Sequence, residues 1–238
     1  MKWFLRFNRT DFTEPEGIGL CVSFPKSGRT WLRVMLDELL ISLRYTHAGS
    51  DHKFAHPLEQ LPNPAEWIGD KPVIFLHRDP RDVVVSGFFQ AAKRRRSYEG
   101  NMSAFLRDPR YGLCKVVAFN DLWLAAVCDR NDVCVVSYEA LHASVQDELH
   151  RIASFFGQMR DAASFTRAAE AGRFETMQEK EMSGAYRERY GSALRPKNPR
   201  DPETFKVRRG TIGGFVDYFS AEDIAYCDEV MARRSIRR

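Results

Sequence analysis

The chain has 238 residues, of which 44% are hydrophobic and 29% charged, with a formal net charge of +4. This length and composition are typical of a single α/β domain over residues 1–238 that buries a sizeable core. So small a net charge argues against nucleic acid as the partner, because nucleic-acid binders concentrate much more positive charge on one face. No stretch approaches the roughly 20 apolar residues that span a membrane, and we identify no signal peptide.

The cysteine pattern bears on the cellular compartment. The five cysteines are scattered and form no C-x-x-C pair. An odd number without close spacing disfavours both a disulfide framework and a structural zinc site. We therefore predict a cytoplasmic protein.

Residues 1–18 resemble a short amphipathic lead-in, and a strand, a loop and a helix follow them. The apolar run Leu20 to Phe24 predicts a buried strand, and apolar residues at helical spacing after Thr30 predict a helix to about Leu43. Between them lies the loop Pro25-Lys26-Ser27-Gly28-Arg29-Thr30. The first amides of a helix have no internal partner and the helix dipole favours negative charge there, so this loop predicts an anion site. It is not a Walker A motif, because its lysine precedes the glycine, and this disfavours an ordinary ATP or GTP site.

Three histidines follow within ten residues. Arg44 to His47 is a candidate short strand, whereas His52 and His56 lie in a proline-broken stretch that predicts a loop. Their spacing matches no compact metal-ligand template, so we predict no metal site. A single histidine that acts as a general base fits the pattern better.

A second strand and helix place an arginine and a serine near the same edge. Val73 to Leu76 predicts a buried parallel strand, and Asp79 is a favourable cap for the helix that follows. Arg78 then lies at the carboxyl end of a strand, where ligands bind in open α/β sheets, with Ser86 two turns into the helix. A guanidinium there suits a phosphate; the alternative is a salt bridge from Arg78 to Asp79 or Asp82.

The rest of the chain continues the alternation. The run Lys93 to Arg96 is typical of a solvated helix face. The charged segment 179–205 predicts a mobile loop or lid, and Arg208-Arg209-Gly210 after it can wrap an anion. One further strand is predicted over 133–138, and helices over 90–98, 111–129, 141–157, 162–177 and 221–234. The alternation implies a parallel sheet that helices cover on both faces.

Three of these segments, Pro25 to Trp31, Arg78 with Ser86, and Arg208-Arg209-Gly210, together resemble the sulfotransferase family that uses 3'-phosphoadenosine 5'-phosphosulfate (PAPS) and releases adenosine 3',5'-bisphosphate (PAP). The first is similar to the family's P-K-S-G-T-T-W loop, with Arg29 in place of the first threonine. The resemblance implies a P-loop-like parallel sheet of about five strands.

The resemblance also implies roles for the matched residues. The loop residues Lys26, Ser27, Gly28, Arg29 and Thr30 are expected to hold the 5'-phosphate, with Trp31 beside the adenine. Arg78 and Ser86 are expected to grip the 3'-phosphate, and Arg208, Arg209 and Gly210 to close over it. Tyr138 matches the tyrosine of a Y-E-x-L/M segment, and Phe174 matches a phenylalanine that packs on the adenine.

The implied reaction is an in-line displacement at sulfur without a metal. A hydroxyl or amine of a small-molecule acceptor attacks, a histidine takes its proton, and Lys26 stabilises charge on the departing phosphate. The family's base lies in a Lys-Thr-His segment. Tyr45-Thr46-His47 keeps the Thr-His, whereas His56 lacks the threonine; we favour His47, because a base must be held rigidly.

Two other functions compete with this interpretation. One is a small-molecule kinase or nucleotide-phosphate transferase, which the absent Walker A lysine disfavours. The other is a non-catalytic binder of anionic nucleotides. The family's dimerisation segment is not matched after Phe215, so the oligomeric state stays open, and so does the identity of the acceptor.

Overall fold

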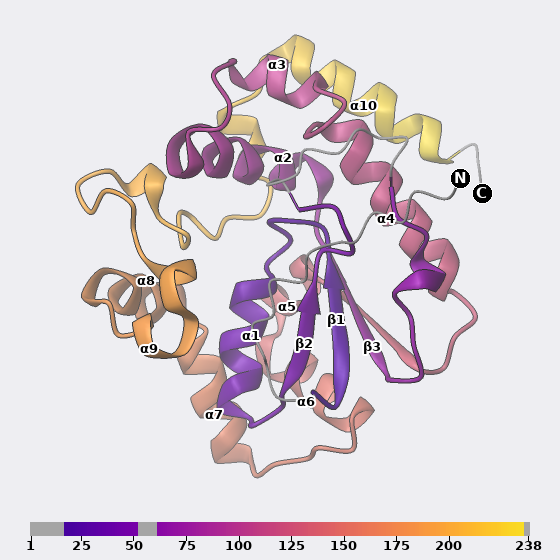
Figure 1. Ribbon diagram of the computed structural model, residues 1–238, viewed down its shortest axis with the longest axis vertical. Coiled ribbons are helices and arrows are strands. Elements are labelled where there is room, and N and C mark those ends of the chain that lie inside the picture. The colour runs from indigo at the N-terminus through magenta and orange to yellow at the C-terminus, as the bar shows by residue number, and fades with distance from the viewer. Residues whose placement is uncertain (1–16, 52–60, 236–238) are drawn as a thin grey trace, which may run out of the picture.

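The computed structural model describes residues 17–51 and 61–235. Its centre is a parallel sheet of four strands, β1 (Gly19–Ser23), β2 (Leu43–Thr46), β3 (Val73–His77) and β4 (Val133–Ser137), in the order β2-β1-β3-β4 (Figure 1). The predicted parallel α/β architecture is confirmed. The expected number of about five strands is corrected to four in the described ranges, because the other apolar residues there recur at helical spacing.

Ten helices occur in the described part of the chain. Shorter turns join them: a π-helical turn η3 (Gln90–Arg95) and the 3-10 turns η2 (Pro64–Glu66), η4 (Gly191–Leu194), η5 (Pro202–Thr204) and η6 (Gly214–Asp217). The helices are α1 (Arg29–Glu38), α2 (Pro80–Phe89), α3 (Met102–Arg107), α4 (Leu113–Val127), α5 (Tyr138–Ala143), α6 (Val145–Phe155), α7 (Ala162–Ala171), α8 (Phe174–Ser183), α9 (Arg187–Tyr190) and α10 (Ala221–Ser235). None of those in the described ranges is long and apolar enough to cross a bilayer.

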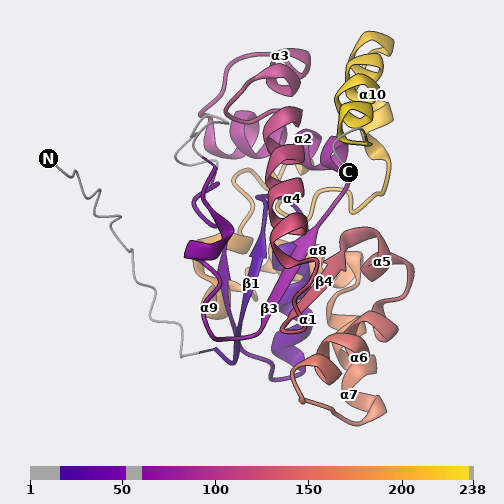
Figure 2. The same ribbon diagram turned by 90° about the vertical axis from the view of Figure 1, so that its right-hand side faces the viewer.

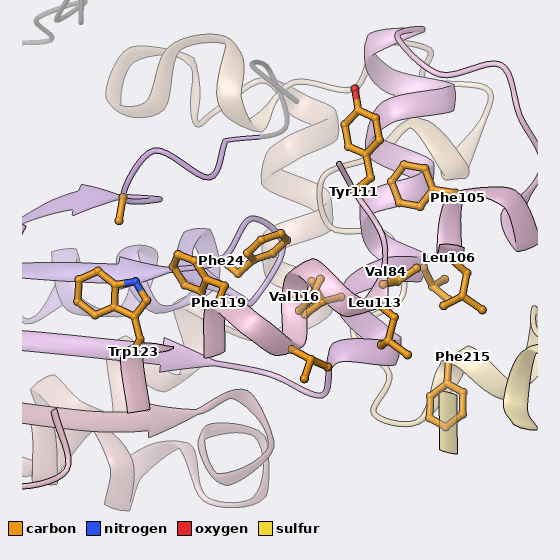
Figure 3. Close-up of a cluster of buried hydrophobic side chains, with 14 of the residues drawn as sticks. Phe24, Val84, Phe105, Leu106, Tyr111, Leu113, Val116, Phe119, Trp123 and Phe215 are labelled. Atoms are coloured by element: carbon orange, nitrogen blue, oxygen red, sulfur yellow. The ribbon is translucent and has the colours of Figure 1, made fainter. Parts of the chain in front are cut away.

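The sheet separates two apolar layers, because neighbouring residues of a strand point to opposite faces. Leu20 and Val22 of β1 pack with α2, α3 and α4, whereas Cys21 packs with α1, α6 and α7. Figure 3 shows part of the first layer, in which Phe24, just after β1, approaches Phe119 of α4 with ring centroids 5.3 Å apart. Both faces are therefore covered, as predicted, and β1 is fixed from both sides.

The helices are placed unevenly around the sheet. In both views α3 and α10 lie beyond one end of the strands and α7 lies toward the other (Figures 1 and 2). The carboxyl ends of parallel strands share one edge, so the segments that follow β1, β2, β3 and β4 meet there.

Several predicted boundaries differ from those observed. Helix α1 ends at Glu38 instead of about Leu43, because Leu40 adopts a left-handed conformation with φ 57° before β2 begins. The helix predicted over 162–177 is two helices, since α7 ends at Ala171. The next residue, Gly172, accepts a hydrogen bond at its carbonyl from the Trp31 indole at 2.7 Å. The helix predicted over 141–157 is likewise two, α5 and α6, which meet at Ser144.

The segment 179–205, for which the sequence predicts a loop, contains the end of α8, then α9, η4 and η5. Glu181 of this segment is fully buried, which ties part of it to the rest of the fold. That the segment 179–205 moves when a ligand binds stays a prediction. The lead-in up to residue 16, His52 and His56 lie outside the described residues.

Candidate anion and sulfuryl-transfer site

The loop between β1 and α1 has an unusual backbone. Lys26 and Gly28 both adopt left-handed conformations, with φ 76° and 97°. A Cβ on Gly28 would lie 2.6 Å from Cδ2 of Tyr138, so the ring and the loop meet only because this residue is glycine. A lysine at positive φ costs about 1 kcal/mol or more, and such strain clusters at functional sites.

The same loop presents polar groups that lack partners. The first turn of α1 has no side-chain cap, which leaves backbone N–H groups to bind an anion. Ser27 is fully buried, and its Oγ has no hydrogen-bond partner in the structure. Burial is the main cause that holds the pKa of Lys26 well below its ordinary value, and nearby cations, Lys206 first among them, add to it. An incoming phosphate would satisfy the free amides and would favour the charged form of Lys26.

Arg78 follows β3 and is held with its guanidinium across the site. Its Cζ lies 4.1 Å from the centroid of the Tyr138 ring, and its Nη2 donates to the carbonyl of Thr211 at 2.9 Å. Nη2 is also 3.5 Å from the Asp82 carboxylate. The salt bridge weighed from the sequence therefore forms with Asp82, while Asp79 pairs with Arg81. The Nε of Arg78 remains buried without a partner, which fits a site for an oxyanion.

Aromatic rings form one wall of the site. Trp31 and Tyr138 pack with ring centroids 5.1 Å apart, and the Tyr138 hydroxyl donates to the carbonyl of Gly210 at 3.2 Å. Gly210 has φ 66°, and a Cβ there would lie 3.1 Å from the Phe174 ring. Two rings from separate helices thus meet at Gly210, and Trp31 packs on one of them, an arrangement that suits the flat face of a purine.

The cationic segment Arg208-Arg209-Gly210 reaches the site from the C-terminal part of the chain. Arg208 donates to the Tyr218 hydroxyl at 2.6 Å and to Glu203 at 3.1 Å, whereas Arg209 pairs with Asp217 at 2.7 Å and is exposed. Both guanidiniums already have partners, and these contacts fix the directions in which they point beside the site.

Asp82 anchors this segment, and sequence reasoning named it only as a possible partner of Arg78. Its carboxylate accepts hydrogen bonds from the backbone N–H groups of Gly213 at 2.8 Å and Phe215 at 3.1 Å. Burial raises the pKa of Asp82, while Arg78 and the two amides oppose that rise. One carboxylate therefore links α2, Arg78 and the C-terminal segment.

A second buried carboxylate was missed from the sequence altogether. Glu181 of α8 accepts the backbone N–H groups of Lys206 at 2.7 Å and Val207 at 2.8 Å, and it lies 3.4 Å from Arg94. Arg94 also donates to the carbonyl of Thr204 at 2.5 Å. The interpretation of Lys93 to Arg96 as a solvated face is therefore wrong for Arg94, which is 8% exposed. The only sign of this pair in the sequence is the high density of charged residues, which does not distinguish a buried charge from a solvated one.

His47 follows β2 at the same edge of the sheet. Its Nδ1 lies 2.8 Å from the carbonyl oxygen of Ser23. A carbonyl oxygen only accepts, so Nδ1 carries the proton and Nε2 is left with its lone pair. Burial, reinforced by the charge of Arg29, holds the pKa of His47 well below 6.5. The imidazole is therefore neutral near pH 7, as a general base must be.

These segments surround one cavity of about 2510 Å³, here called the central cavity, which is lined by residues from all four strand ends and from the C-terminal segment. Every site residue that the sequence predicted lines it except Ser27, which is fully buried within the loop. Among the described residues no three His, Cys, Asp or Glu side chains are grouped to hold a metal ion.

Comparisons with known proteins agree with this fold. The fold is similar to that of mouse sulfotransferase SULT7A1 complexed with PAP, with a TM-score of 0.71, 19% identity, and 92% of this chain and 85% of that chain covered. It is also similar to retinol dehydratase in complex with androsterone and the inactive cofactor PAP, with a TM-score of 0.67, 17% identity, and 92% and 81% covered. A complex of retinol dehydratase with retinol and PAP gives a TM-score of 0.65 at 17% identity, with 92% of this chain and 82% of that chain covered.

A comparison with curated protein sequences finds no match. The family model described as the sulfotransferase domain matches residues 55–236, which is most of the chain. The match begins after the loop at Lys26, so it does not depend on the first of the three segments that carry the resemblance. This chain belongs to the sulfotransferase domain family.

Proposed function

We propose that this protein transfers the sulfuryl group of PAPS to a hydroxyl or amine of a small-molecule acceptor. The observation that carries the proposal is the convergence of the loop at Lys26, of Arg78 and of Arg208 on one cavity, beside a histidine whose Nε2 is unprotonated. Two clusters of cations suit a donor with phosphate at two positions. The PAP in the similar structures supports this choice of donor.

Each group has a distinct role in the proposed reaction. As the bond from the acceptor oxygen or nitrogen to sulfur forms, the bond from sulfur to the bridging phosphate oxygen breaks. Nε2 of His47 receives the acceptor's proton, and Lys26 with the loop amides stabilises the negative charge that develops on the departing phosphate. Arg78 and Ser86 hold the 3'-phosphate, and Trp31, Tyr138 and Phe174 surround the adenine. No step requires a metal, and we propose that the reaction takes place in the cytoplasm.

We propose that the acceptor is a small molecule. The central cavity is larger than the roughly 300–1,000 Å³ typical of a single-ligand pocket, so it has room for a small acceptor beside the donor. The androsterone and retinol in the similar structures are of this class.

The experiment is a transfer assay with sulfur-labelled PAPS and a panel of phenols, alcohols, sugars and amines. We expect labelled product with wild type, loss of transfer with His47→Asn at unchanged PAP affinity, and retained transfer with His142→Asn, a control histidine that also lines the cavity. Full activity of His47→Asn would move the base to another histidine. Absence of both transfer and PAP binding in wild type would contradict the proposed function.

A further inference from the structure

Asp82 of α2 is a carboxylate in the wall of the central cavity, beside the arginine proposed to hold the 3'-phosphate. Its side chain is 3% exposed, and its Oδ2 lies 3.5 Å from Nη2 of Arg78. A negative charge at this distance weakens the positive field that an incoming phosphate meets. Attraction of the phosphate therefore does not explain the carboxylate, and its other contacts have to.

The contacts of Asp82 and Arg78 form a closed ring with the backbone of the C-terminal segment. Nη2 of Arg78 donates to the carbonyl of Thr211 at 2.9 Å. Further along the segment, the N–H of Gly213 donates to Oδ2 of Asp82 at 2.8 Å, and this is the oxygen that faces Arg78. The N–H of Phe215 donates to the other oxygen, Oδ1, at 3.1 Å. Arg78 and the segment are thus each held by Asp82 and also by one another.

This ring fixes how the guanidinium of Arg78 lies. Thr211 and Asp82 hold Nη2 at one end, and the Tyr138 ring lies against the guanidinium, 4.1 Å from Cζ. The Nε is buried and has no hydrogen-bond partner among the described residues. Because a guanidinium is planar and donates in fixed directions, its orientation decides which of its donors can reach an oxyanion. The direction in which Arg78 presents its remaining donors is therefore set in part by Asp82.

We propose that Asp82 is a positioning residue for donor recognition. It holds the guanidinium of Arg78 and the segment Gly210 to Phe215 in the arrangement that distinguishes a nucleotide with a 3'-phosphate from one without it. This inference rests on the proposed function and adds to it a residue that acts through Arg78 and does not itself bind the donor. An anchor of the segment with no influence on Arg78 would leave that distinction unchanged.

The test compares the dissociation constants of PAP and of adenosine 5'-monophosphate in wild type and Asp82→Asn by calorimetric titration. The amide has nearly the shape of the carboxylate but no charge. We expect the variant to lose about five-fold or more of the wild-type preference for PAP, within the coupling usual for residues in contact. The direction of the change separates two explanations, because a carboxylate that acted only by repelling the phosphate would raise the preference when removed.

A double variant shows whether Asp82 acts through Arg78. Arg78→Ala combined with Asp82→Asn should lose no more of the preference than Arg78→Ala alone, to within about two-fold. Asp223→Asn is the matched control for the loss of a buried carboxylate. Asp223 is likewise buried, pairs with Arg107 and accepts the backbone N–H of Ser220 at 3.2 Å, but it does not line the central cavity. This control should keep the preference for PAP.

Gly213→Ala tests the ring from the side of the segment without altering a buried charge. Gly213 has φ 71°, and a Cβ there would meet no atom of the described residues within 4 Å, so alanine strains the backbone without a clash. The strain should displace the N–H that Asp82 accepts and lower the preference for PAP. Gly184→Ala, at φ 77° and with equally open surroundings among the described residues, is the matched control and should keep the preference.

Three outcomes would overturn the inference. One is an unchanged preference in Asp82→Asn, or in Gly213→Ala if Asp82→Asn does not fold, since Asp82 would then be a structural anchor only. Another is a raised preference, which would show that the carboxylate merely repels the phosphate. The third is a double variant that loses clearly more than Arg78→Ala, because Asp82 would then act independently of Arg78. Wild type that binds neither nucleotide would instead overturn the proposed function, and this inference with it.

Discussion

The two cationic segments of the site are held in place by different forces. The loop at Lys26 is continuous with β1 and α1, and it is fixed because both elements lie in the apolar core, with Phe24 and Leu32 fully buried. The segment 204–215 begins and ends near two buried phenylalanines, Phe205 and Phe215, and is held between them by polar contacts. Its backbone is held by Asp82, Glu181 and Arg94, which bind its amides and a carbonyl.

The difference shows how much each segment depends on single side chains. Register and packing of a whole sheet position the loop, so changing one of its side chains should alter chemistry more than structure. The C-terminal segment depends on buried charges, and breaking one such pair leaves a charge without compensation. We therefore expect mutations in the loop at Lys26 to change activity with little change in stability. Mutations that disrupt the segment 204–215 should change both.

The largest expected effect is that of Lys26→Ala. Removing the cation nearest the departing phosphate should lower the rate of transfer about 10²–10³-fold, the loss usual for a group that stabilises transition-state charge. The Tm should not fall, because burial and neighbouring cations already disfavour the charge of Lys26. Transfer kinetics and calorimetric unfolding check both parts. Lys71→Ala, which removes another cavity-lining lysine, is the control, and near-normal turnover of Lys26→Ala would contradict the assigned role.

Glu181→Gln tests the other side of the comparison. The change should lower the free energy of unfolding by about 3 kcal/mol, since Arg94 loses its buried partner, and PAP affinity should fall with it. Denaturant unfolding and calorimetric titration measure the two quantities. Glu179→Gln, an exposed glutamate of the same helix, should change neither. Wild-type stability in Glu181→Gln would show that polar anchors do not hold the C-terminal segment.

Arg78→Ala sharpens the assignment of the 3'-phosphate. Wild type should prefer PAP to adenosine 5'-monophosphate, and the variant should lose about ten-fold or more of that preference, because a charge-assisted contact disappears. Comparing the two dissociation constants in each protein isolates the effect. Arg81→Ala, whose guanidinium pairs with Asp79, should keep the preference. If Arg78→Ala still discriminates, the 3'-phosphate lies elsewhere.

The pH dependence is the smallest expected effect. The pKa of His47 is held below 6.5 in the folded protein, so the transfer rate should stay level as the pH falls from about 7.5 to 6.5 and decline only below that range. In the unfolded chain His47 takes up a proton near pH 6.5, whereas in the folded protein it stays neutral at that pH. Protonation therefore favours the unfolded state, and His47 makes the folded state less stable as the pH falls further. A rate profile of wild type over this range measures the first effect. A midpoint near 7 would contradict a neutral, half-buried His47 as the base.

The features that the sequence predicts correctly are local, whereas those that it misses depend on contacts between distant residues. The strand, loop and helix around Lys26 are local, and so is the Asp79 cap of α2, which bonds to the amide of Arg81 two residues away. Glu181 and Arg94 contact each other across 87 residues, and a stretch rich in charge gives no local sign of which charges are buried. At the break between α7 and α8, Gly172 likewise contacts a distant residue, Trp31, which is 141 residues away.

The donor assignment is tested most directly by calorimetric titration of the protein with PAP, alongside ATP with Mg²⁺. Our account predicts that PAP binds with a dissociation constant of about 1 μM or tighter, or roughly −8 kcal/mol, and that ATP binds much more weakly. Binding of ATP without binding of PAP would contradict it and indicate phosphoryl transfer instead.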